Sequence, residues 1–278
     1  MPLYKAAKKP IFRQPAHIPF APVALTGVFP FATNITRVGL MESSCSDYHG
    51  FDGRNECIGI IGGCMMNKHM FFENAYFIIG TSYAGKSTMV KELAKKHSGI
   101  ACEENYHDHF SGELDAKEFP CLSYTRDLKD WHDFIRRSPQ EYKAWIDGAK
   151  KECEVLELRM LPEICNLGKK VFVDTNICVE TLREIAPLNH TLVMLADPEI
   201  PLHRFFDRPD PEKQFLYKLI MEEPDPEKAM ENYRQGLKLI CSQESYDELH
   251  NSGFHVIYRD ENRTIAQTVA LAEKAFGL

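Results

Sequence analysis

The sequence has no Cys-x-x-Cys pair, although it contains nine cysteines. Scattered cysteines in odd number argue against a disulfide framework and against a zinc ribbon. We therefore expect reduced thiols and a cytoplasmic protein. The chain also lacks an excess of basic residues, since 33 Lys and Arg stand against 40 Asp and Glu, a formal net charge of −7. This balance argues against broad binding to nucleic acid and favours small-molecule partners.

Acidic residues are missing from the first 41 positions, and no charged residue lies between Arg13 and Arg37. Such a start loosely resembles a targeting peptide. Four prolines interrupt any helix there: Pro15, Pro19, Pro22 and Pro30. Residues 1–73 carry seven basic and five acidic residues, net +2, whereas residues 74–278 carry 26 and 35, net −9. We predict an extended or partly ordered N-terminal extension over 1–73 and one domain over 74–278.

Membrane and disordered classes are not favoured by the composition. Hydrophobic residues make up 44% of the 278 positions and charged residues 26%, close to the globular average. We expect a soluble protein with no membrane partner and no nucleic-acid partner. No sequence feature indicates an oligomeric state.

A phosphate-binding motif follows the first strong strand signal. Residues 75–79 are apolar, aromatic and branched, as a buried parallel strand requires. The next residues, Gly80-Thr81-Ser82-Tyr83-Ala84-Gly85-Lys86-Ser87-Thr88, match G-x-x-x-x-G-K-[ST] without mismatch. Apolar residues then recur at helical spacing: Met89, Val90, Leu93 and Ala94. The order of strand, loop and helix predicts a cradle for the phosphates of ATP.

The residue types of this loop fit that chemistry. Gly80 and Gly85 let the backbone turn its N–H groups toward a phosphate chain, and the helix start adds the positive end of its dipole. We expect Lys86 to bridge the β and γ phosphates and Ser87 to offer a hydroxyl to Mg²⁺. The predicted nucleotide contacts also include Ser82, Tyr83, Ala84 and Thr88.

A second strand signal, residues 171–174, ends in Asp174, a candidate carboxylate for holding magnesium. Thr175 follows it, where hydrolytic ATPases of the AAA or helicase type usually place a Glu that activates water. No N-K-x-D guanine-reading motif follows the loop either. Hydrolytic motors and GTPase switches are therefore disfavoured.

A third strand signal, residues 191–195, leads into Asp197-Pro198-Glu199 and then to Arg204 and Arg208. Here the sequence resembles the small-molecule P-loop kinases, which include adenylate, cytidylate, shikimate and deoxynucleoside kinases and chloramphenicol phosphotransferase. In that group a P-x-E type turn leads to a helix bearing R-x-x-x-R at the base of a lid. The resemblance implies a three-layer α/β P-loop NTPase fold with a central parallel sheet, and arginines that stabilise the transferring phosphoryl group. We expect Arg204 and Arg208 on one helix face.

The last strand signal, residues 254–258, precedes a polar loop over 259–264 and a helix. In the kinases that the chain resembles, this loop lies against the adenine base. We therefore count Asn262 among the predicted nucleotide contacts.

Candidate acceptor chemistry begins at Glu103 and Glu104, which follow a short expected strand near residues 99–102, between the glycine-rich loop and the strand at 171–174. In shikimate kinase and the phosphotransferases, an acidic residue there binds magnesium or takes the acceptor proton. Since neighbours on a strand point to opposite faces, only one should face the site, and we favour Glu104. A general base suits a hydroxyl acceptor better than a nucleoside monophosphate, whose attacking oxygen is already ionised.

The same stretch admits another interpretation, a transition-metal site. Its potential ligands are Glu103, Glu104, His107, Asp108 and His109. Residues 110–165 are expected to form mostly helical material that covers the acceptor, with a helix over 152–161. Arginines there could hold an acceptor phosphate or carboxylate: Arg126, Arg136 and Arg137.

Pro-Asp-Pro-Glu-Lys occurs twice, at 209–213 and 224–228. We interpret Asp210 and Asp225 as N-caps of two consecutive helices, with Pro211 and Pro226 at the first helical position. The repeat then indicates helix starts rather than a second site.

The sequence as a whole predicts an ATP- and Mg²⁺-dependent phosphotransferase acting on a small hydroxyl-bearing acceptor. Lys86, Glu104 or Glu103, Arg204 and Arg208 are the predicted catalytic residues, and Ser87 and Asp174 the metal ligands. Two alternatives remain open: a nucleoside monophosphate kinase, and a nucleotide-binding regulator without turnover.

Overall fold

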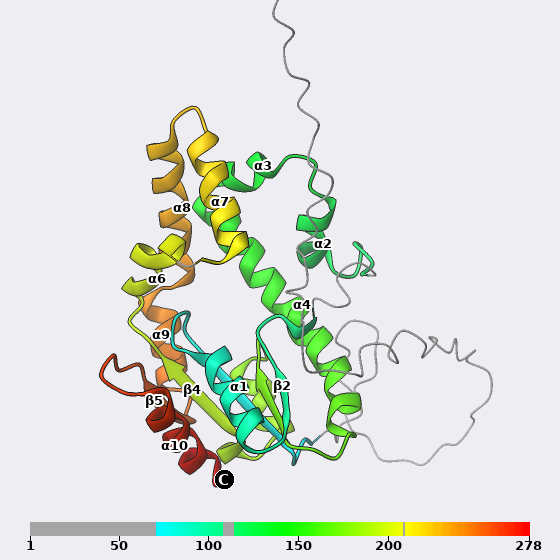
Figure 1. The fold of residues 1–278 in the computed structure, drawn as a ribbon. Helices are drawn as coiled ribbons and strands as arrows, with labels where there is room; N and C mark the ends of the chain where they lie inside the picture. The colour runs from blue at the N-terminus through cyan, green and yellow to red at the C-terminus, as the bar shows by residue number, and fades with distance from the viewer. Residues whose placement is uncertain (1–70, 108–113, 208) are drawn as a thin grey trace, which may run out of the picture. The chain divides into compact units, whose positions relative to one another are not determined.

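The computed structural model describes residues 71–107, 114–207 and 209–278 (Figure 1). All of them belong to one unit of the chain, residues 52–278. Nearly all of the N-terminal extension predicted over 1–73 lies outside the described residues, as do Asp108, His109 and Arg208.

The described chain is an α/β structure built on a five-stranded, all-parallel sheet. The strands are β1 (Ala75–Gly80), β2 (Ile100–Cys102), β3 (Val171–Asp174), β4 (Thr191–Leu195) and β5 (His255–Tyr258). Their order across the sheet is β2-β3-β1-β4-β5. The first strand in sequence therefore lies in the middle, and the loop that follows it is flanked by the ends of β3 and β4.

Helices account for most of the remaining chain. The α-helices are α1 (Lys86–Lys96), α2 (Pro120–Asp127), α3 (Trp131–Arg136), α4 (Pro139–Cys165), α5 (Val179–Ile185), α6 (Glu199–Arg204), α7 (Pro211–Glu222), α8 (Pro226–Ile240), α9 (Gln243–His250) and α10 (Ile265–Phe276). Two 3₁₀ turns, η3 (Leu188–His190) and η4 (Phe205–Asp207), complete the set.

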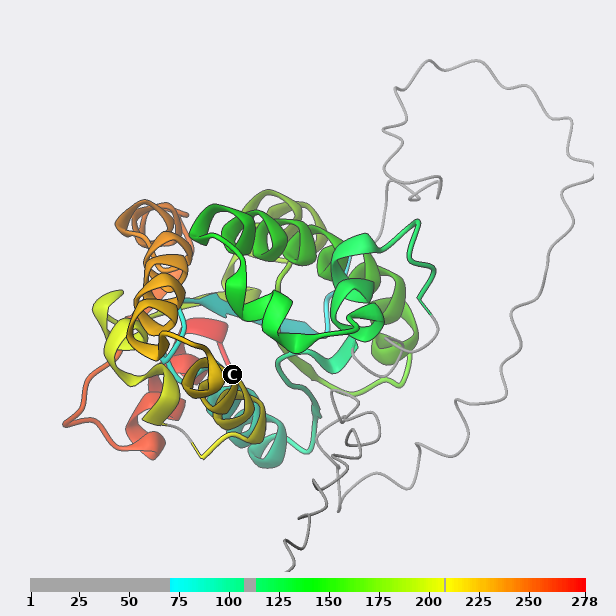
Figure 2. The same ribbon diagram turned by 90° about the horizontal axis from the view of Figure 1, so that it is seen from above.

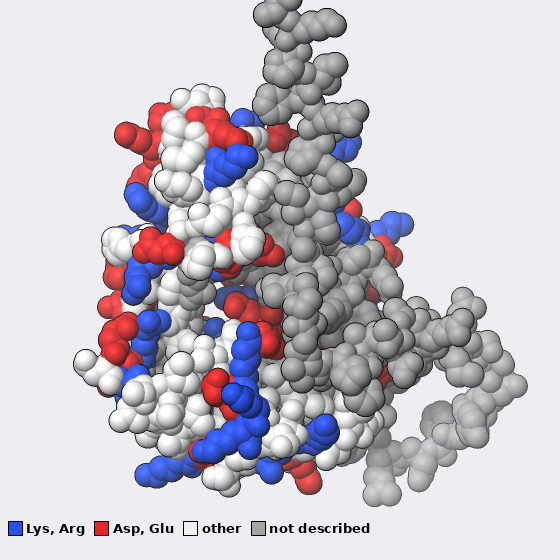
Figure 3. All heavy atoms as spheres, in the orientation of Figure 1, with Lys and Arg blue, Asp and Glu red and all other residues white. Residues whose placement is uncertain are grey.

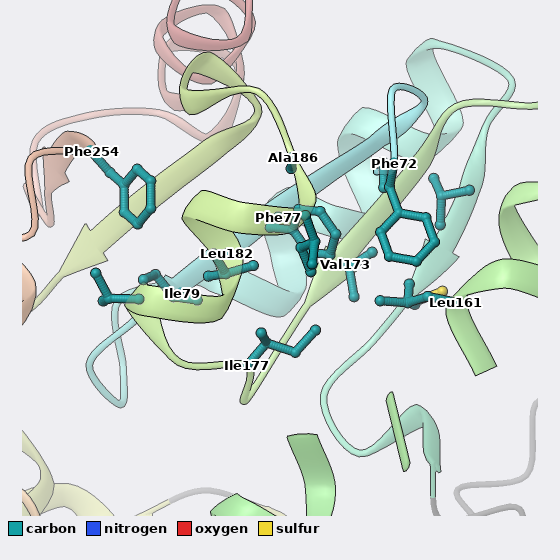
Figure 4. Close-up of a cluster of buried hydrophobic side chains, with 14 of the residues drawn as sticks. Phe72, Phe77, Ile79, Leu161, Val173, Ile177, Leu182, Ala186 and Phe254 are labelled. Carbon is teal, nitrogen blue, oxygen red and sulfur yellow. The ribbon is translucent and has the colours of Figure 1, made fainter. Parts of the chain in front are cut away.

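Both faces of the sheet are buried, which explains why the strands read as continuous apolar runs. Side chains alternate along β1, so Phe77 and Ile79 join one cluster while Tyr76 and Ile78 join the other. The first cluster packs the sheet against α5 and the end of α4 (Figure 4). The second packs it against α1 and α10. Helices therefore cover the sheet on both sides.

A third apolar cluster lies away from the sheet. It is built from α3, α7, α8 and the first half of α4, with Phe134, Tyr233 and Leu237 at its centre. We call these helices, together with α2, the helical cap. Figure 2, which looks down on the cap, shows α2, α3 and α4 on one side and α7 and α8 on the other.

The helix α4 joins the cap to the sheet. It runs over 27 residues, longer than the helix expected over 152–161, and starts with a capping box at Ser138 and Glu141. Tyr142 lies against the cap cluster, whereas Leu161 is buried in the cluster under the sheet. One continuous helix thus spans both cores.

The repeated Pro-Asp-Pro-Glu-Lys has the role predicted for it. Asp210 accepts a hydrogen bond from the N–H of Glu212 and caps α7, and Asp225 accepts from the N–H of Lys228 and caps α8. A proline occupies the first turn of each helix. Among the described residues, none of the helices combines the length and the apolar character needed to cross a bilayer.

Candidate functional site

The loop that joins β1 to α1 starts at a position where only glycine fits. Gly80 has a φ of 146°, and a Cβ built there would lie 1.8 Å from the carbonyl oxygen of Met194 on β4. Gly85, with a φ of 94°, is the left-handed residue from which α1 starts. Tyr83 also has a positive φ, 67°, a costly conformation for a non-glycine residue. The surrounding structure must therefore hold the loop in place.

Thr81 supplies much of that support. Its N–H donates to the carbonyl of Met194 at 3.1 Å. Its hydroxyl donates to the carbonyl of Ala196 at 3.2 Å and accepts from the N–H of Ala196 at 2.7 Å. Three hydrogen bonds therefore fix the first turn of the loop to the end of β4.

Three polar side chains of the predicted site converge at the start of α1. The hydroxyl of Ser87 donates to Oδ2 of Asp174 at 2.8 Å, and Nζ of Lys86 lies 3.9 Å from Oδ1 of Asp174. Nζ of Lys86 also donates to the carbonyl of Thr81 at 3.4 Å. Because β3 lies beside β1, the parallel ladder brings Asp174 to the loop from a position 87 residues further along the chain.

Burial governs the electrostatics of Asp174. Desolvation raises the pKa of this carboxyl to about 6, although the nearby Lys86 charge and the Ser87 hydrogen bond oppose the shift. Negative charges on Glu104 and Glu157 raise the pKa further. A buried carboxylate with only partial compensation, beside a hydroxyl and an ammonium group, favours binding of a cation at this point.

Glu103 and Glu104 differ in their surroundings. They lie in the turn after β2, which ends at Cys102, so the strand alternation on which we based the choice between them does not apply. Glu103 pairs with Lys91 on α1 at 2.8 Å. Glu104 is exposed, and its charge acts on Asp174. Glu104 is thus the one whose charge reaches the convergence of Lys86, Ser87 and Asp174.

The helix expected to carry Arg204 and Arg208 on one face is shorter than predicted. It ends at Arg204, and η4 follows. The neighbouring Phe205 and Phe206 both place their rings against Tyr233 in the cap, with centroids 5.6 and 5.5 Å away. The segment after α6 thus presents two consecutive aromatic rings to the same residue of the cap.

The segment near Arg204 is tied to the loop through Tyr83. The phenol of Tyr83 donates to the carbonyl of Arg204 at 2.7 Å, and Nη1 of Arg259 donates to the carbonyl of Tyr83. Arg259 lowers the pKa of Glu261, and Arg204 adds to this effect. The loop after β5 therefore lies near both Arg204 and the glycine-rich loop. Asn262 belongs to this exposed loop, where its N–H donates to Asp260 at 2.9 Å.

The three candidate acceptor arginines lie in different environments. Arg126 is bonded to its neighbour Asp127 and to the carbonyl of Leu114. Arg136 pairs with Glu223 at 3.0 Å. Both are therefore committed to partners within the protein.

Arg137, in contrast, has no carboxylate within ion-pair distance in the described part of the chain. Its guanidinium lies over four aromatic rings, 4.0 to 5.3 Å from their centroids: Phe134, Trp145, Tyr124 and Tyr142. Its Nη2 is buried without a hydrogen-bond acceptor, and burial lowers the pKa of the group. Arg137 is the one arginine of the three with a buried donor that lacks an acceptor.

A transition-metal site is not found among residues 71–107, 114–207 and 209–278, because no three His, Cys, Asp or Glu side chains gather there in metal-binding geometry. Asp108 and His109 lie outside these ranges. His107 is buried, with Nδ1 3.6 Å from Oε1 of Glu157 and Nε2 3.1 Å from Sγ of Cys153.

Glu157 is a residue near the site that the sequence analysis missed. It is fully buried and accepts hydrogen bonds from Thr175 and Asn176, directly after Asp174. A signal was present, since Glu157 falls on the apolar stripe of α4 formed by Cys153, Leu156 and Leu161. A charged residue in a buried helical register indicates a specific partner.

No protein-family model matches this chain, and no curated protein matches it.

Proposed function

We propose that this protein is an ATP- and Mg²⁺-dependent phosphotransferase of the P-loop type, acting on a small hydroxyl-bearing acceptor. The observation that carries the proposal is the convergence of Lys86, Ser87 and Asp174 at the start of α1, behind a loop that requires Gly80 and Gly85. The five-stranded parallel sheet with helices on both faces is consistent with the three-layer P-loop NTPase fold.

In this proposal the loop holds the triphosphate. Backbone N–H groups from Ser82 to Thr88 and the positive end of the α1 dipole favour bound phosphate oxygens. The Lys86 ammonium neutralises charge on the β and γ phosphates. Its Nζ lies 3.9 Å from Oδ1 of Asp174, longer than a close ion pair, so we expect it to pair with phosphate instead when ATP binds.

The donor set beside Lys86 fits magnesium. Mg²⁺ prefers oxygen ligands, and the Ser87 hydroxyl and Asp174 carboxylate provide two oxygens 2.8 Å apart. When bound, the ion supplies positive charge that stabilises the negative charge on the phosphate oxygens. Asp174 and Ser87 are the residues that would hold it.

Glu104 is the proposed general base. As the acceptor hydroxyl oxygen bonds to the γ-phosphorus, the bond from that phosphorus to the β–γ bridging oxygen breaks and ADP departs. The hydroxyl proton passes to the Glu104 carboxylate, which is exposed. Glu103 is less suited to this role because it forms an ion pair with Lys91. Arg204, at the end of α6, would stabilise the phosphoryl charge together with Arg208.

The experiment that tests the proposal is phosphoryl transfer from γ-labelled ATP with Mg²⁺, screened against pooled nucleosides, nucleotides, sugars, polyols and antibiotics. We expect one labelled product, lost in Lys86→Ala. A Lys86→Ala protein with full turnover contradicts the mechanism. Tight ATP binding without product from any pool points instead to a nucleotide-binding regulator.

Arg137 favours a second candidate, a nucleoside monophosphate kinase. Its buried Nη2 lacks an acceptor, and aromatic rings surround its guanidinium, so an anionic acceptor with a planar base would find both a charge partner and stacking surfaces. The matched pair Arg137→Lys and Arg136→Lys separates the candidates. If the acceptor carries a phosphate, Arg137→Lys should raise its KM about tenfold or more, whereas Arg136→Lys should change it little.

A further inference from the structure

We propose that Glu157 of α4 is a positioning residue that holds the Asp174 carboxylate against Ser87 and Lys86 by clamping the turn after β3. The inference rests on the proposed function, because it concerns the magnesium-binding carboxylate of that same site. Glu157 does not itself touch the loop; it acts through Thr175 and Asn176.

The turn after Asp174 delivers three donors to one carboxylate. The hydroxyl of Thr175 donates to Oε2 of Glu157. The N–H of Asn176 lies 3.3 Å from both carboxylate oxygens, and Nδ2 of Asn176 donates to Oε1 at 3.2 Å. The Thr175 hydroxyl in turn accepts from the N–H of Ile177 at 3.0 Å. Each of the three residues that follow Asp174 is therefore held, directly or through one hydroxyl, by Glu157.

The hydrogen bonds of the sheet end where the hydrogen bonds to Glu157 begin. β3 ends at Asp174, and the N–H of Thr175 makes one more bond, to the carbonyl of Ile78 at 3.3 Å. Beyond that bond, Asn176 and Ile177 lie outside the strands of the described chain. The backbone on the carboxyl side of Asp174 is thus positioned from α4, and that backbone determines where the Asp174 side chain starts.

The free-energy cost of burying Glu157 indicates that its hydrogen bonds to Thr175 and Asn176 have a specific role beyond filling space in the core. A carboxylate with 0% exposure loses its hydration, and only full hydrogen bonding compensates for that loss. A leucine at this register would extend the apolar stripe of α4. It would leave the Thr175 hydroxyl and the Asn176 N–H without an acceptor, at the step where the chain must present Asp174.

Glu154, one turn earlier on α4, provides the matched control. It accepts from the Thr181 hydroxyl at 2.6 Å and from the N–H of Cys178 at 3.4 Å, at the start of α5. It therefore ties α4 to the start of α5, and its hydrogen bonds do not involve residues 174–177. If Glu157 served only to dock α4 on the following segment, Glu154→Gln and Glu157→Gln should behave alike.

The test measures the dissociation constant of ATP by titration calorimetry on the full chain. One titration contains about 5 mM Mg²⁺, and the other contains a chelator instead. We expect Glu157→Gln and Thr175→Val to weaken binding about 10-fold or more with Mg²⁺ and less than about twofold with chelator, as for other groups that support a metal ligand. Thr175→Ser keeps the hydroxyl and should retain wild-type affinity in both conditions. Glu154→Gln should do the same.

Thr175→Val carries the decision if Glu157→Gln fails to fold, because it preserves shape and charge and removes only the hydroxyl. Wild-type affinity of Thr175→Val in Mg²⁺, with binding lost in Asp174→Asn, overturns the positioning role and leaves the proposed function intact. The positioning role is also overturned if Thr175→Val weakens ATP binding equally with and without Mg²⁺. A wild-type protein that binds ATP in neither condition overturns the proposed function together with this inference.

Discussion

Gly80 and Gly168 both have a positive φ, 146° and 70°, but they differ in what surrounds them. A methyl group at Gly80 would meet the backbone of Met194, which cannot move without breaking the β1–β4 pairing, whereas Gly168 has no atom within 4 Å of its Cβ position. We expect Gly80→Ala to lower the free energy of unfolding by about 3 kcal/mol or more, and Gly168→Ala by about 1 kcal/mol. Urea denaturation of both variants checks this, and equal losses would contradict the steric explanation.

The buried charge of Asp174 is expected to lower the free energy of unfolding, although the proposed function requires it. Its pKa is raised from 3.8 to about 6, so the folded protein disfavours the ionised form, and above pH 6 the charge lowers stability. In metal-free buffer at pH 7, Asp174→Asn should therefore raise the free energy of unfolding by about 1–3 kcal/mol. The gain should shrink as the pH falls from about 6 to below 3.8, where the wild-type carboxyl is protonated in both the folded and the unfolded state.

The same variant should lose Mg²⁺-dependent ATP binding, since an amide replaces the carboxylate. Chemical denaturation across pH and calorimetric titration measure the two effects on one protein. A destabilised Asp174→Asn at pH 7 would show that the Asp174 charge is compensated by its neighbours more fully than its burial indicates.

At the scale of elements, Glu223 joins α3 to the end of α7. It accepts from Nδ1 of His132 at 2.6 Å and from Nε of Arg136 at 3.0 Å, and these contacts, with Arg136 the larger, lower its pKa from 4.5. A depressed carboxyl pKa stabilises the fold above about pH 4.5 and loses that effect as the pH falls through the folded-state value.

We expect Glu223→Gln to lower the free energy of unfolding by about 1–2 kcal/mol at pH 7 and by progressively less below pH 4.5. The adjacent Glu222, whose side chain is 49% exposed, provides the control. Glu222→Gln should change stability by less than about 0.5 kcal/mol. Equal losses in the two variants would contradict the role given to the hydrogen bonds of Glu223 with Arg136 and His132.

Elements were predictable from the sequence where local chemistry decides them. The branched apolar runs 75–79, 171–174 and 191–195 become β1, β3 and β4 within one residue, and Asp210 and Asp225 cap the helices predicted for them. The lower accuracy elsewhere has tertiary causes. Contact with two separate cores extends α4 beyond its apolar stretch, and α6 gives way to η4 at Phe205, whose ring packs on Tyr233 in the cap.

The site shows the same division. The glycine-rich loop and Asp174 were evident as motifs, and their meeting follows from parallel strand pairing. The position of Glu157 on an apolar stripe was visible in the sequence, but its role was not, because its partners Thr175 and Asn176 lie 18 and 19 residues away and only the fold brings them to it. The choice of Arg137 among three arginines likewise depends on which neighbours have carboxylates, a property of the folded cap.

For the described molecule as a whole, α4 is the link between the cap and the sheet. Lys150 is an exposed residue between the two ends of this helix. Lys150→Pro should lower the free energy of unfolding by about 3 kcal/mol, because proline removes a helical hydrogen bond and clashes with the preceding turn. We also expect faster amide hydrogen exchange in α7 and α8 than in β1 and β4 of this variant.

Lys150→Ala is the control for that substitution and should leave both quantities nearly unchanged. Hydrogen exchange read by mass spectrometry distinguishes the regions. Uniform acceleration across cap and sheet in Lys150→Pro would mean that the two cores unfold as one cooperative unit whatever the state of α4.

The length of α4 has a mechanical consequence. Twenty-seven residues make a rod about 40 Å long, so a tilt of about 5° at one end displaces the other by about 3 Å. Tyr142 and Trp145 lie at the cap end of this rod, and Glu157 at the sheet end. A ligand that separates the aromatic side chains of the cap should therefore also displace Glu157 and the turn that carries Asp174. By thermodynamic reciprocity, a ligand that fixes Asp174 should restrict the cap to the same extent. Binding at the cap and binding at Asp174 would then be linked by one coupling free energy.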